Sequence, residues 1–371
     1  MRVLIAVGHA GIYAGGAHQA LYAIMGLRRA GVEVTAVWGP DAAGDSEGLA
    51  RLREVCSNVI IMNINHNPTL ASLRQFRQIL MDFDPDIVET FKSSAQYHAL
   101  FGGIGLNRFG LLFYRGISRQ MDYFQELKYR LKRVDVVVPN CMALQEIILR
   151  SGRINPRKVQ LIYDEVDPAC NNPEMVDGSG LRKELGIPEE ALLVTHLGNY
   201  SVWRGQDVTL RAVKILKDRG LDFRMLFCGE GTEKLKPLVD DLKLADWVTL
   251  SPYRRDPARV LKISDLLVNS SIGNESLSGA LLNSQAMGIP AVASRMPGFD
   301  ESVGDGETGV LVPVNNAEAF AGGMAKFLDM PETERRAWGA KAHRRAMEKF
   351  SSEARVRRRL EVYQMAIDNR K

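Results

Sequence analysis

A stretch of small and polar residues near position 275 has the make-up of a site for a phosphorylated ligand. It reads NSSIGNESLSGALLNSQAMGIPAVAS, and a helix should begin near Ser278. Ser278, Gly279 and Ala280 would present unpaired backbone amides and the positive end of the helix dipole to phosphate oxygens. Glu275, just before this helix, either belongs to the ligand site or only stabilises the dipole. Asn283, a turn further on, is either part of the site or a buried amide bonded to the backbone.

Two glycine-containing loops are further candidates, because open parallel sheets bind ligands beyond the carboxyl ends of their strands. The loop GHAGIYAGGAH places Gly15 and Gly16 before a helix, where backbone amides could approach an anion, although a tight turn explains both glycines equally well. The loop GNYSVWRGQD carries Arg204, whose permanently charged guanidinium suits a diphosphate. A surface arginine that caps a turn is the alternative for Arg204.

Residue spacing argues against several other kinds of site. Glycines at positions 8, 11, 15 and 16 do not form the G-x-G-x-x-G pattern of dinucleotide-binding folds, so a dehydrogenase is disfavoured. The six histidines and four cysteines show no metal-ligand spacing, and the pair Asp84 and Asp86 precedes a strand instead of following one. We therefore expect no metal dependence and no cofactor. A net charge of +4 over 371 residues argues against a nucleic-acid-binding module.

Apolar strands that alternate with helices predict the scaffold that positions these residues. Residues 2–7 form a continuous apolar run that leads into a glycine loop and a helix, as expected for a parallel strand buried on both faces. Residues 27–38 and 216–227 share one pattern: a helix ends at a glycine, and an acidic residue and then a strand follow. This pattern indicates a repeated unit. We predict an α/β protein of two Rossmann-like, doubly wound lobes that face each other across a cleft.

The length of 371 residues fits two such lobes. A cluster of Pro, Gly, Asn and Asp at 171–180 predicts the linker, so the lobes should span 1–172 and 173–351, with a C-terminal helix at 352–371 packing back on the first. The opening apolar run at 3–7 is too short for a signal peptide or a membrane span. Together with the scattered cysteines, it predicts a cytoplasmic protein.

Taken together, these motifs make the chain resemble glycosyltransferase family 4 over nearly its whole length. The similarity is carried by AGGAHQALYAIMGLRRAGVEVTAVWG, GNYSVWRGQDVTLRAVKIL, CGEG and, most specifically, NESLSGALLNSQAMGIPAVASRMPGFDESVGDGETGVLVP. The resemblance implies the GT-B fold and transfer of a sugar, with retention, from a nucleotide donor to a glycan or lipid-linked acceptor. It also implies a part in the synthesis of cell-envelope polysaccharide or other glycoconjugates.

The resemblance implies a role for each candidate residue. Gly15 and Gly16 would lie near the donor phosphate and the acceptor. Arg204 would replace the family's diphosphate-binding lysine, and Glu275 would contact hydroxyls of the transferred sugar. The nucleotide base would lie near residues 251–254, which include Tyr253. Departure of a nucleoside diphosphate is assisted by electrostatic stabilisation, which Arg204 and the helix amides would supply.

Three positions depart from the family pattern. Asn283 stands where the family has the second of two glutamates, which would hold the ribose hydroxyls. Asn199 replaces the usual arginine of the donor loop, and Arg115 replaces a histidine after the fourth strand. These changes fit an unusual donor, with Arg115 reaching the phosphates from across the cleft. They also fit a different class of protein, one that binds sugar nucleotides but has a decayed transferase site.

Residues 108–133 support a separate hypothesis about a partner. They contain seven basic and two acidic residues together with six aromatic side chains, a combination that favours anionic lipid surfaces. A solvated helix whose aromatic residues face the core is the alternative. The hypothesis predicts peripheral contact with the inner face of a membrane.

Overall fold

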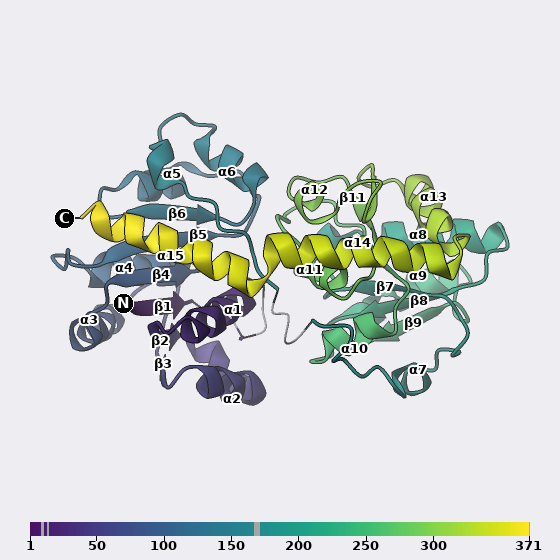
Figure 1. Cartoon of the computed structure of the whole chain (residues 1–371), viewed down its shortest axis with the longest axis horizontal. Helices are drawn as coiled ribbons and strands as arrows, with labels where there is room; N and C mark the ends of the chain where they lie inside the picture. The colour runs from purple at the N-terminus through teal and green to yellow at the C-terminus, as the bar shows by residue number, and fades with distance from the viewer. Residues whose placement is uncertain (9–10, 13–14, 167–170, 371) are drawn as a thin grey trace. The chain divides into compact units, whose positions relative to one another are not determined.

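The computed structural model describes residues 1–8, 11–12, 15–166 and 171–370, and this part of the chain forms two compact units (Figure 1). Unit 1 comprises Met1–Glu165 and Ser352–Lys371, and unit 2 comprises Val166–Ser351. Four positions of the first glycine loop, 9, 10, 13 and 14, lie outside the described residues, as does Cys170.

Unit 1 contains, within its described residues, one six-stranded parallel sheet with the strand order β3-β2-β1-β4-β5-β6. The strands are β1 (Arg2–Val7), β2 (Glu33–Trp38), β3 (Asn58–Ile61), β4 (Ile87–Phe91), β5 (Gly110–Arg115) and β6 (Val136–Pro139). The α-helices are α1 (Gly16–Arg29), α2 (Ser46–Val55), α3 (Leu70–Phe83), α4 (Ser93–Gly102), α5 (Tyr123–Arg130), α6 (Met142–Leu149) and α15 (Ser352–Asp368). Short 3₁₀ helices are η1 (Pro40–Gly44) and η2 (Pro156–Lys158).

Unit 2 contains, again within the described residues, a second six-stranded parallel sheet with the order β12-β11-β10-β7-β8-β9. The strands are β7 (Leu193–Leu197), β8 (Arg224–Cys228), β9 (Val248–Ser251), β10 (Leu266–Asn269), β11 (Ala291–Ser294) and β12 (Gly309–Val312). The α-helices are α7 (Leu181–Glu184), α8 (Gln206–Asp218), α9 (Lys236–Asp241), α10 (Pro257–Lys262), α11 (Gly279–Ala286), α12 (Phe299–Ser302), α13 (Ala317–Leu328) and α14 (Glu332–Phe350). Short 3₁₀ helices are η3 (Val202–Arg204) and η4 (Thr232–Leu235).

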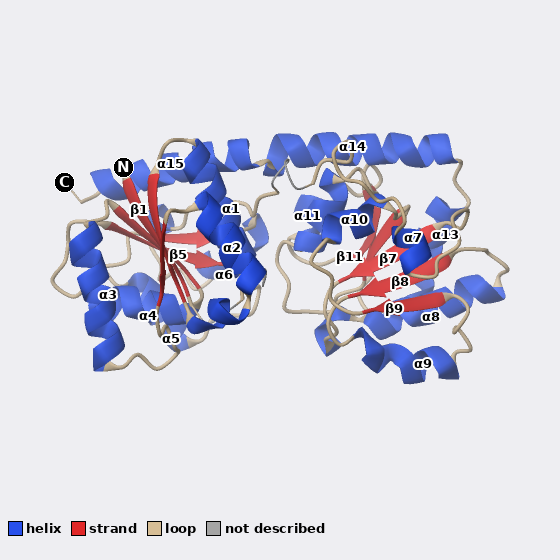
Figure 2. Cartoon of the chain, turned by 90° about the horizontal axis from the view of Figure 1, so that it is seen from below, coloured by secondary structure: helices blue, strands red, loops and turns tan. Residues whose placement is uncertain are grey.

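Helices cover both faces of each sheet, as Figure 2 shows, and this explains why a strand such as β1 is apolar at consecutive positions. In β1, every residue from Val3 to Val7 is fully buried. A strand with one solvated face would instead alternate apolar and polar side chains. The prediction of two doubly wound α/β lobes is confirmed.

The strand order of each sheet reverses at one point, between β1 and β4 in unit 1 and between β7 and β10 in unit 2. Loops that leave neighbouring strands at such a point run toward opposite faces of the sheet, so they leave a crevice at its carboxyl edge. In unit 2 these are the loops that carry Arg204 and Glu275.

Helix α15, at the end of the chain, belongs to unit 1 and is fixed there by buried charges. The Arg359 guanidinium lies 2.5 Å from a Glu89 carboxylate oxygen and 3.4 Å from one of Glu165. The Tyr363 hydroxyl donates a hydrogen bond to Glu89. Burial raises the pKa of Glu165 to about 7, although Arg359 acts in the opposite direction. The last helix therefore completes the core of the first unit.

Candidate functional site

The loops after β7 and β10 are joined by backbone contacts at the switch point of unit 2. Gly205 has a φ of 59°, and a side chain there would lie 2.1 Å from the Ser270 carbonyl oxygen, so only glycine fits. The Ser270 hydroxyl donates to the Gly205 carbonyl at 2.7 Å. The amide of Ile272 donates to the Trp203 carbonyl, also at 2.7 Å. This junction holds the side chains of the two loops in fixed relative positions.

Arg204 and Glu275 meet across this junction as an ion pair. Their nearest nitrogen and oxygen atoms, Nη1 and Oε1, are 3.1 Å apart, and the side chains are 29% and 18% exposed. Burial raises the pKa of Glu275, and the neighbouring guanidinium partly opposes that shift. A side chain at Gly198 would lie 3.4 Å from the Arg204 guanidinium, which shows that the guanidinium packs on the backbone at the end of β7. The pair is accessible enough for a ligand to exchange with either partner.

The N-terminus of α11 lies directly after this pair in the chain and presents backbone amides without a side-chain cap. Ser278 is the N-cap residue, but its hydroxyl makes no capping hydrogen bond to the helix. It accepts instead from Asn269 Nδ2 at 2.9 Å. Gly279 is exposed, and a Cβ added there would meet no atom within 4 Å. Of the three predicted residues, Gly279 is exposed and Ala280 half-buried, whereas Ser278 is buried. The open position for an anion at this helix start is therefore at Gly279 and Ala280.

Two of the remaining candidates in unit 2 differ in how firmly they are held. The Asn199 side-chain oxygen accepts from the Glu230 amide at 3.0 Å, so it ties the loop after β7 to the CGEG loop after β8. Asn283 is half-buried on α11, and among the described residues its side chain has no hydrogen-bond partner. Asn199 therefore has a structural function in the loop after β7, whereas the Asn283 amide remains available.

The segment predicted to lie near a nucleotide base follows β9. Tyr253 is 47% exposed there. Its neighbour Arg254 is held by ion pairs, 2.6 Å from Glu184 and 2.8 Å from Asp256, and the hydrogen bonds to those carboxylates raise its pKa. A fixed arginine next to an exposed tyrosine gives this loop one rigid and one accessible side chain.

The first glycine loop and Arg115 lie in unit 1. Gly15 has a φ of 46° and is exposed at the start of α1. A Cβ atom at Gly16 would lie 3.3 Å from the Tyr114 ring, so the Gly16 backbone lies close to that ring. Arg115 is the last residue of β5, whereas the prediction placed it after the fourth strand. Its guanidinium donates to Gln125 Oε1 at 3.1 Å and to the carbonyl of Arg119. Arg115 is thereby held against the segment that leads into α5.

A polar cavity of about 340 Å³ opens in unit 1 beyond the carboxyl ends of β4 and β5, and Gly16 and Arg115 line it. Lys92 and Arg119 line it too, and no aspartate or glutamate is among its described lining residues. Burial lowers the pKa of Lys92, whose backbone has a φ of 74°. The cavity is suited to an anionic group. Neither Lys92 nor Arg119 was predicted from the sequence; the available signal was a basic residue in the segment just after a predicted strand.

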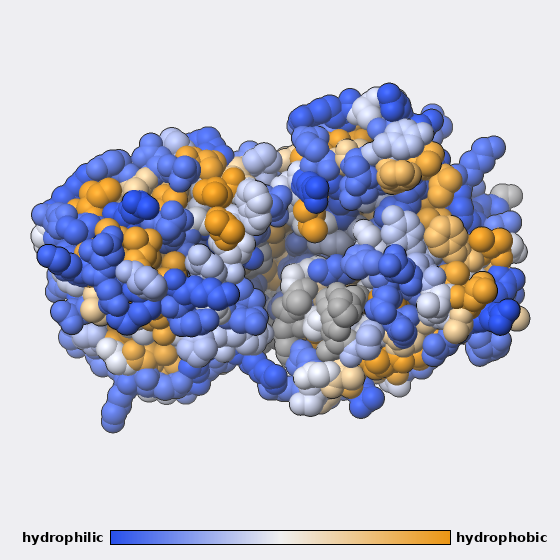
Figure 3. Space-filling model, turned by 180° about the vertical axis from the view of Figure 1, so that it is seen from behind, coloured by the Kyte–Doolittle hydropathy of each residue, from blue (hydrophilic) through white to orange (hydrophobic). Residues whose placement is uncertain are grey.

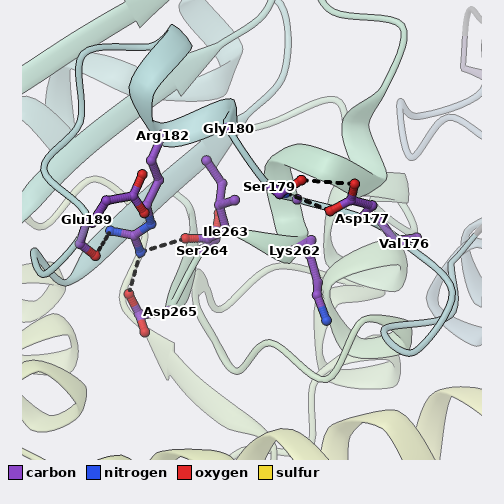
Figure 4. Close-up of a pocket in the computed structure, with 11 residues that line it drawn as sticks. Val176, Asp177, Ser179, Gly180, Arg182, Glu189, Lys262, Ile263, Ser264 and Asp265 are labelled. Atoms are coloured by element: carbon purple, nitrogen blue, oxygen red, sulfur yellow. Dashed lines mark hydrogen bonds and ion pairs between the residues drawn. The ribbon is translucent and has the colours of Figure 1, made fainter.

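Another cavity, of about 380 Å³, lies at the opposite, amino end of the unit 2 strands (Figure 4). Its arginine, Arg182, donates to the carbonyls of Pro188, Glu189, Ala191 and Ile263 and lies 3.4 Å from Asp265. A guanidinium with this many protein acceptors stabilises the loops around β7 and has little capacity left for an anion. We therefore interpret this cavity as structural.

Among the described residues, no group of three or more histidine, cysteine, aspartate or glutamate side chains is placed to hold a metal ion. None of the described helices combines the length and the apolar character that crossing a bilayer demands.

Comparison with known families gives two matches that divide the chain in the same order as its lobes. The family described as Glycosyltransferase Family 4 matches residues 13–169, and the family described as Glycosyl transferases group 1 matches residues 179–345. The second match includes every candidate residue of unit 2 named above, from Asn199 to Asn283.

Curated relatives are similar over part of their length. N-acetyl-alpha-D-glucosaminyl L-malate synthase from Bacillus anthracis is 30% identical over 214 residues, covering 57% of this chain and 55% of that protein. D-inositol 3-phosphate glycosyltransferase from Thermomonospora curvata is 33% identical over 232 residues, covering 58% of this chain and 53% of that protein. The chain thus spans about half the length of the curated relatives it matches.

Solved structures share the fold across the whole chain. A glycosyltransferase from Rickettsia africae aligns with a TM-score of 0.87 at 19% identity, covering 99% of both chains. HepE from Anabaena, solved in complex with UDP-glucose, aligns with a TM-score of 0.80 at 19% identity, covering 98% of this chain and 99% of that one. At these identities the likeness establishes the architecture alone.

Proposed function

Because the chain belongs to glycosyltransferase family 4 and has the GT-B fold, we propose that it transfers a sugar from a nucleoside diphosphate donor to a glycan or lipid-linked acceptor. The transfer proceeds with retention of anomeric configuration. Unit 2 binds the donor and unit 1 the acceptor. The product belongs to a cell-envelope polysaccharide or another glycoconjugate, and the protein acts in the cytoplasm or at the inner face of the membrane.

The observation that carries this proposal is the conjunction of a cation, a carboxylate and an uncapped helix start at one switch point. Arg204 and the amides of Gly279 and Ala280 hold the diphosphate, whose charge grows as the bond to the sugar breaks. Glu275 accepts hydrogen bonds from hydroxyls of the sugar and so orients it. Asn283 holds the ribose, and Tyr253 with its loop lies beside the base.

The ion pair gives donor binding a defined sequence of contacts. In the free protein Glu275 neutralises Arg204 at 3.1 Å. A diphosphate carries more charge than a carboxylate and therefore competes for the guanidinium. Release of Arg204 leaves Glu275 with unpaired oxygens at the point where the sugar follows the phosphates. On donor binding, Arg204 thus exchanges Glu275 for the diphosphate, and Glu275 exchanges Arg204 for the sugar.

The acceptor carries an anionic group that binds in the polar cavity of unit 1. Three cations, Lys92, Arg115 and Arg119, line that cavity, and none of its described lining residues is acidic. One relative is named for a product that contains L-malate and another for D-inositol 3-phosphate, and both of these compounds are anions. The sequence-based role of Arg115 at the donor phosphates stays a prediction, since its guanidinium is bonded to Gln125 and Arg119 within unit 1.

A thermal-shift panel of nucleoside diphosphate sugars, followed by assay of donor hydrolysis without acceptor, tests the function. UDP-glucose is the first donor to include, because it occupies a protein of the same fold. We expect at least one donor to raise the melting temperature and to be hydrolysed slowly to free sugar and nucleoside diphosphate. Binding without hydrolysis supports the decayed-site alternative, which the internal bonds of Asn199 and Arg115 favour. No stabilisation by any donor contradicts both.

A further inference from the structure

An apolar groove of about 570 Å³ runs between α4 and α5 on the surface of unit 1. Large side chains from both helices and from the residues after α4 line it: Tyr97, Leu100, Phe101, Ile104, Phe124 and Leu127. Phe124 is 73% exposed and Ile104 65% exposed. Apolar side chains of this size rarely stand together in water on a protein that has no partner for them.

The aromatic residues of 108–133, all of them described, divide between core and surface. Those that are buried are Phe109, Phe113, Tyr114 and Tyr129. Tyr123 and Phe124, at the start of α5, are the exposed ones. Figure 3 shows apolar side chains on the surface of unit 1 interspersed with hydrophilic ones. The core therefore accounts for the first four aromatic residues, and the surface pair requires another explanation.

The charges around this groove have one sign. Lys128, Lys132 and Arg133 line it, and no acidic residue does so among the described residues. Lys132 is exposed, and no ion pair involves it within the described chain. Lys128 lies 4.8 Å from the centre of the Tyr97 ring and donates to Gln96. Arg133 is paired with Asp135 at 3.6 Å. The groove is thus an apolar surface with one exposed lysine at its edge, unpaired among the described residues, because Lys128 is buried and Arg133 is paired. Such a surface complements a layer of anionic headgroups above hydrocarbon.

We propose that the α4–α5 groove docks unit 1 on the surface of an anionic phospholipid bilayer. Phe101, Ile104, Phe124 and Leu127 enter the boundary between headgroups and acyl chains, and Lys132 contacts lipid phosphates. A bilayer fits better than a protein partner, because the exposed side chains offer apolar bulk and positive charge with few groups that could make directed hydrogen bonds.

The same two helices connect the groove to the polar cavity of unit 1. On α4, Gln96 lines the cavity and the next residue, Tyr97, lines the groove. On α5, Phe124 lines the groove and the next residue, Gln125, lines the cavity. Docking would therefore bring an anion-binding cavity to the depth of the headgroups. This consequence rests on the proposed function, because it identifies the acceptor as a lipid with an anionic headgroup. The docking proposal itself does not depend on the proposed function.

Vesicle flotation tests the docking with the whole chain. The protein is mixed with vesicles of phosphatidylcholine alone or of phosphatidylcholine with phosphatidylglycerol, and the floating fraction is measured. We expect flotation with the anionic vesicles, weakened by added salt. Phe124→Ser combined with Ile104→Ser should lower the partition coefficient at least roughly tenfold, because two exposed side chains no longer enter the interface. Leu70→Ser is the matched control, since Leu70 is 72% exposed on α3 of the same unit and should have no effect.

UDP binding by each variant, measured in parallel, separates this proposal from the proposed function. Groove variants that bind UDP normally and no longer float support the docking. Absence of flotation by the unmodified protein at low salt overturns it, as does equal loss of flotation in the Leu70→Ser control. Flotation that persists in Lys132→Ser together with the groove variant assigns lipid binding to another surface. A protein that floats but binds no nucleotide retains the docking and loses the proposed function.

Discussion

Replacing Arg204 by alanine should separate binding of the nucleotide from orientation of the sugar. In the free protein the guanidinium is 29% exposed and lies 3.1 Å from Glu275. A charge-assisted hydrogen bond to phosphate contributes on the order of 1.5 to 3 kcal/mol. Binding of the diphosphate must first break the partly solvated ion pair between Arg204 and Glu275, and this cost offsets roughly 0 to 1 kcal/mol of the phosphate contact. The net loss of about 0.5 to 3 kcal/mol should therefore lower the affinity for a nucleoside diphosphate about two- to 150-fold.

Replacing Glu275 by glutamine should not weaken binding of the bare diphosphate and can strengthen it. The variant lacks the carboxylate that competes for Arg204, so the diphosphate should bind as well as before or up to about fivefold more tightly. The intact donor should gain nothing from the change, because the carboxylate that orients the sugar is lost. Turnover should fall by at least roughly tenfold.

Calorimetry with UDP and with UDP-glucose, alongside turnover, measures both effects. Arg295→Ala is the matched control, because Arg295 is paired with Asp305 in the same unit and lies outside the candidate site. Its diphosphate affinity should be unchanged. Equal loss of diphosphate binding in the Arg204 and Glu275 variants would refute the division of roles and show that Glu275 shapes the helix start. Unchanged binding in Arg204→Ala would move the phosphate site elsewhere.

The other predictions concern a departure from the family pattern and the buried charges of unit 1. Asn283→Glu should fold normally and change nucleotide affinity, seen by circular dichroism and calorimetry; a misfolded variant would make Asn283 a core amide. Arg359→Met should lower the free energy of unfolding by about 3 to 5 kcal/mol in urea, because it leaves buried carboxylates without a cation, whereas Arg358→Met at the half-exposed neighbour should cost far less. The pKa of Glu165 is raised from 4.5 to about 7, so the native state binds the extra proton and its contribution to stability falls as the pH rises between those values. Glu165→Gln should flatten that part of the stability profile, and an unchanged profile would show that Glu165 does not titrate there.

The sequence predicts the fold because each lobe repeats one short-range signal. Continuous apolar runs such as residues 2–7, each followed by a helix, specify parallel strands buried on both faces. The same logic locates Arg204 and Glu275, because both follow strands and the carboxyl ends of parallel strands share one edge. Their pairing was not predicted, since it depends on how two loops from different strands meet.

Other features depend on side-chain direction, which a linear pattern does not encode. Asn199 was interpreted as a departure in the donor loop, yet its bond to the Glu230 amide depends on the neighbouring strand β8. Lys92 belongs to no motif and acquires meaning only from the cavity that it lines. In 108–133, Phe113 turns inward and Phe124 outward, although both are aromatic residues in a basic segment.

The return of α15 to unit 1 has a consequence for the order in which the protein folds during synthesis. Glu89 and its partner Arg359 are 270 positions apart, so the first sheet to leave the ribosome lacks its counter-charge until the last helix is made. Unit 2, built from one uninterrupted segment, can fold before that. The N-terminal half of the chain is thus made first and completed last, with a slow, long-range closing step. A fusion or deletion at the C-terminus should therefore affect the unit at the opposite end of the sequence.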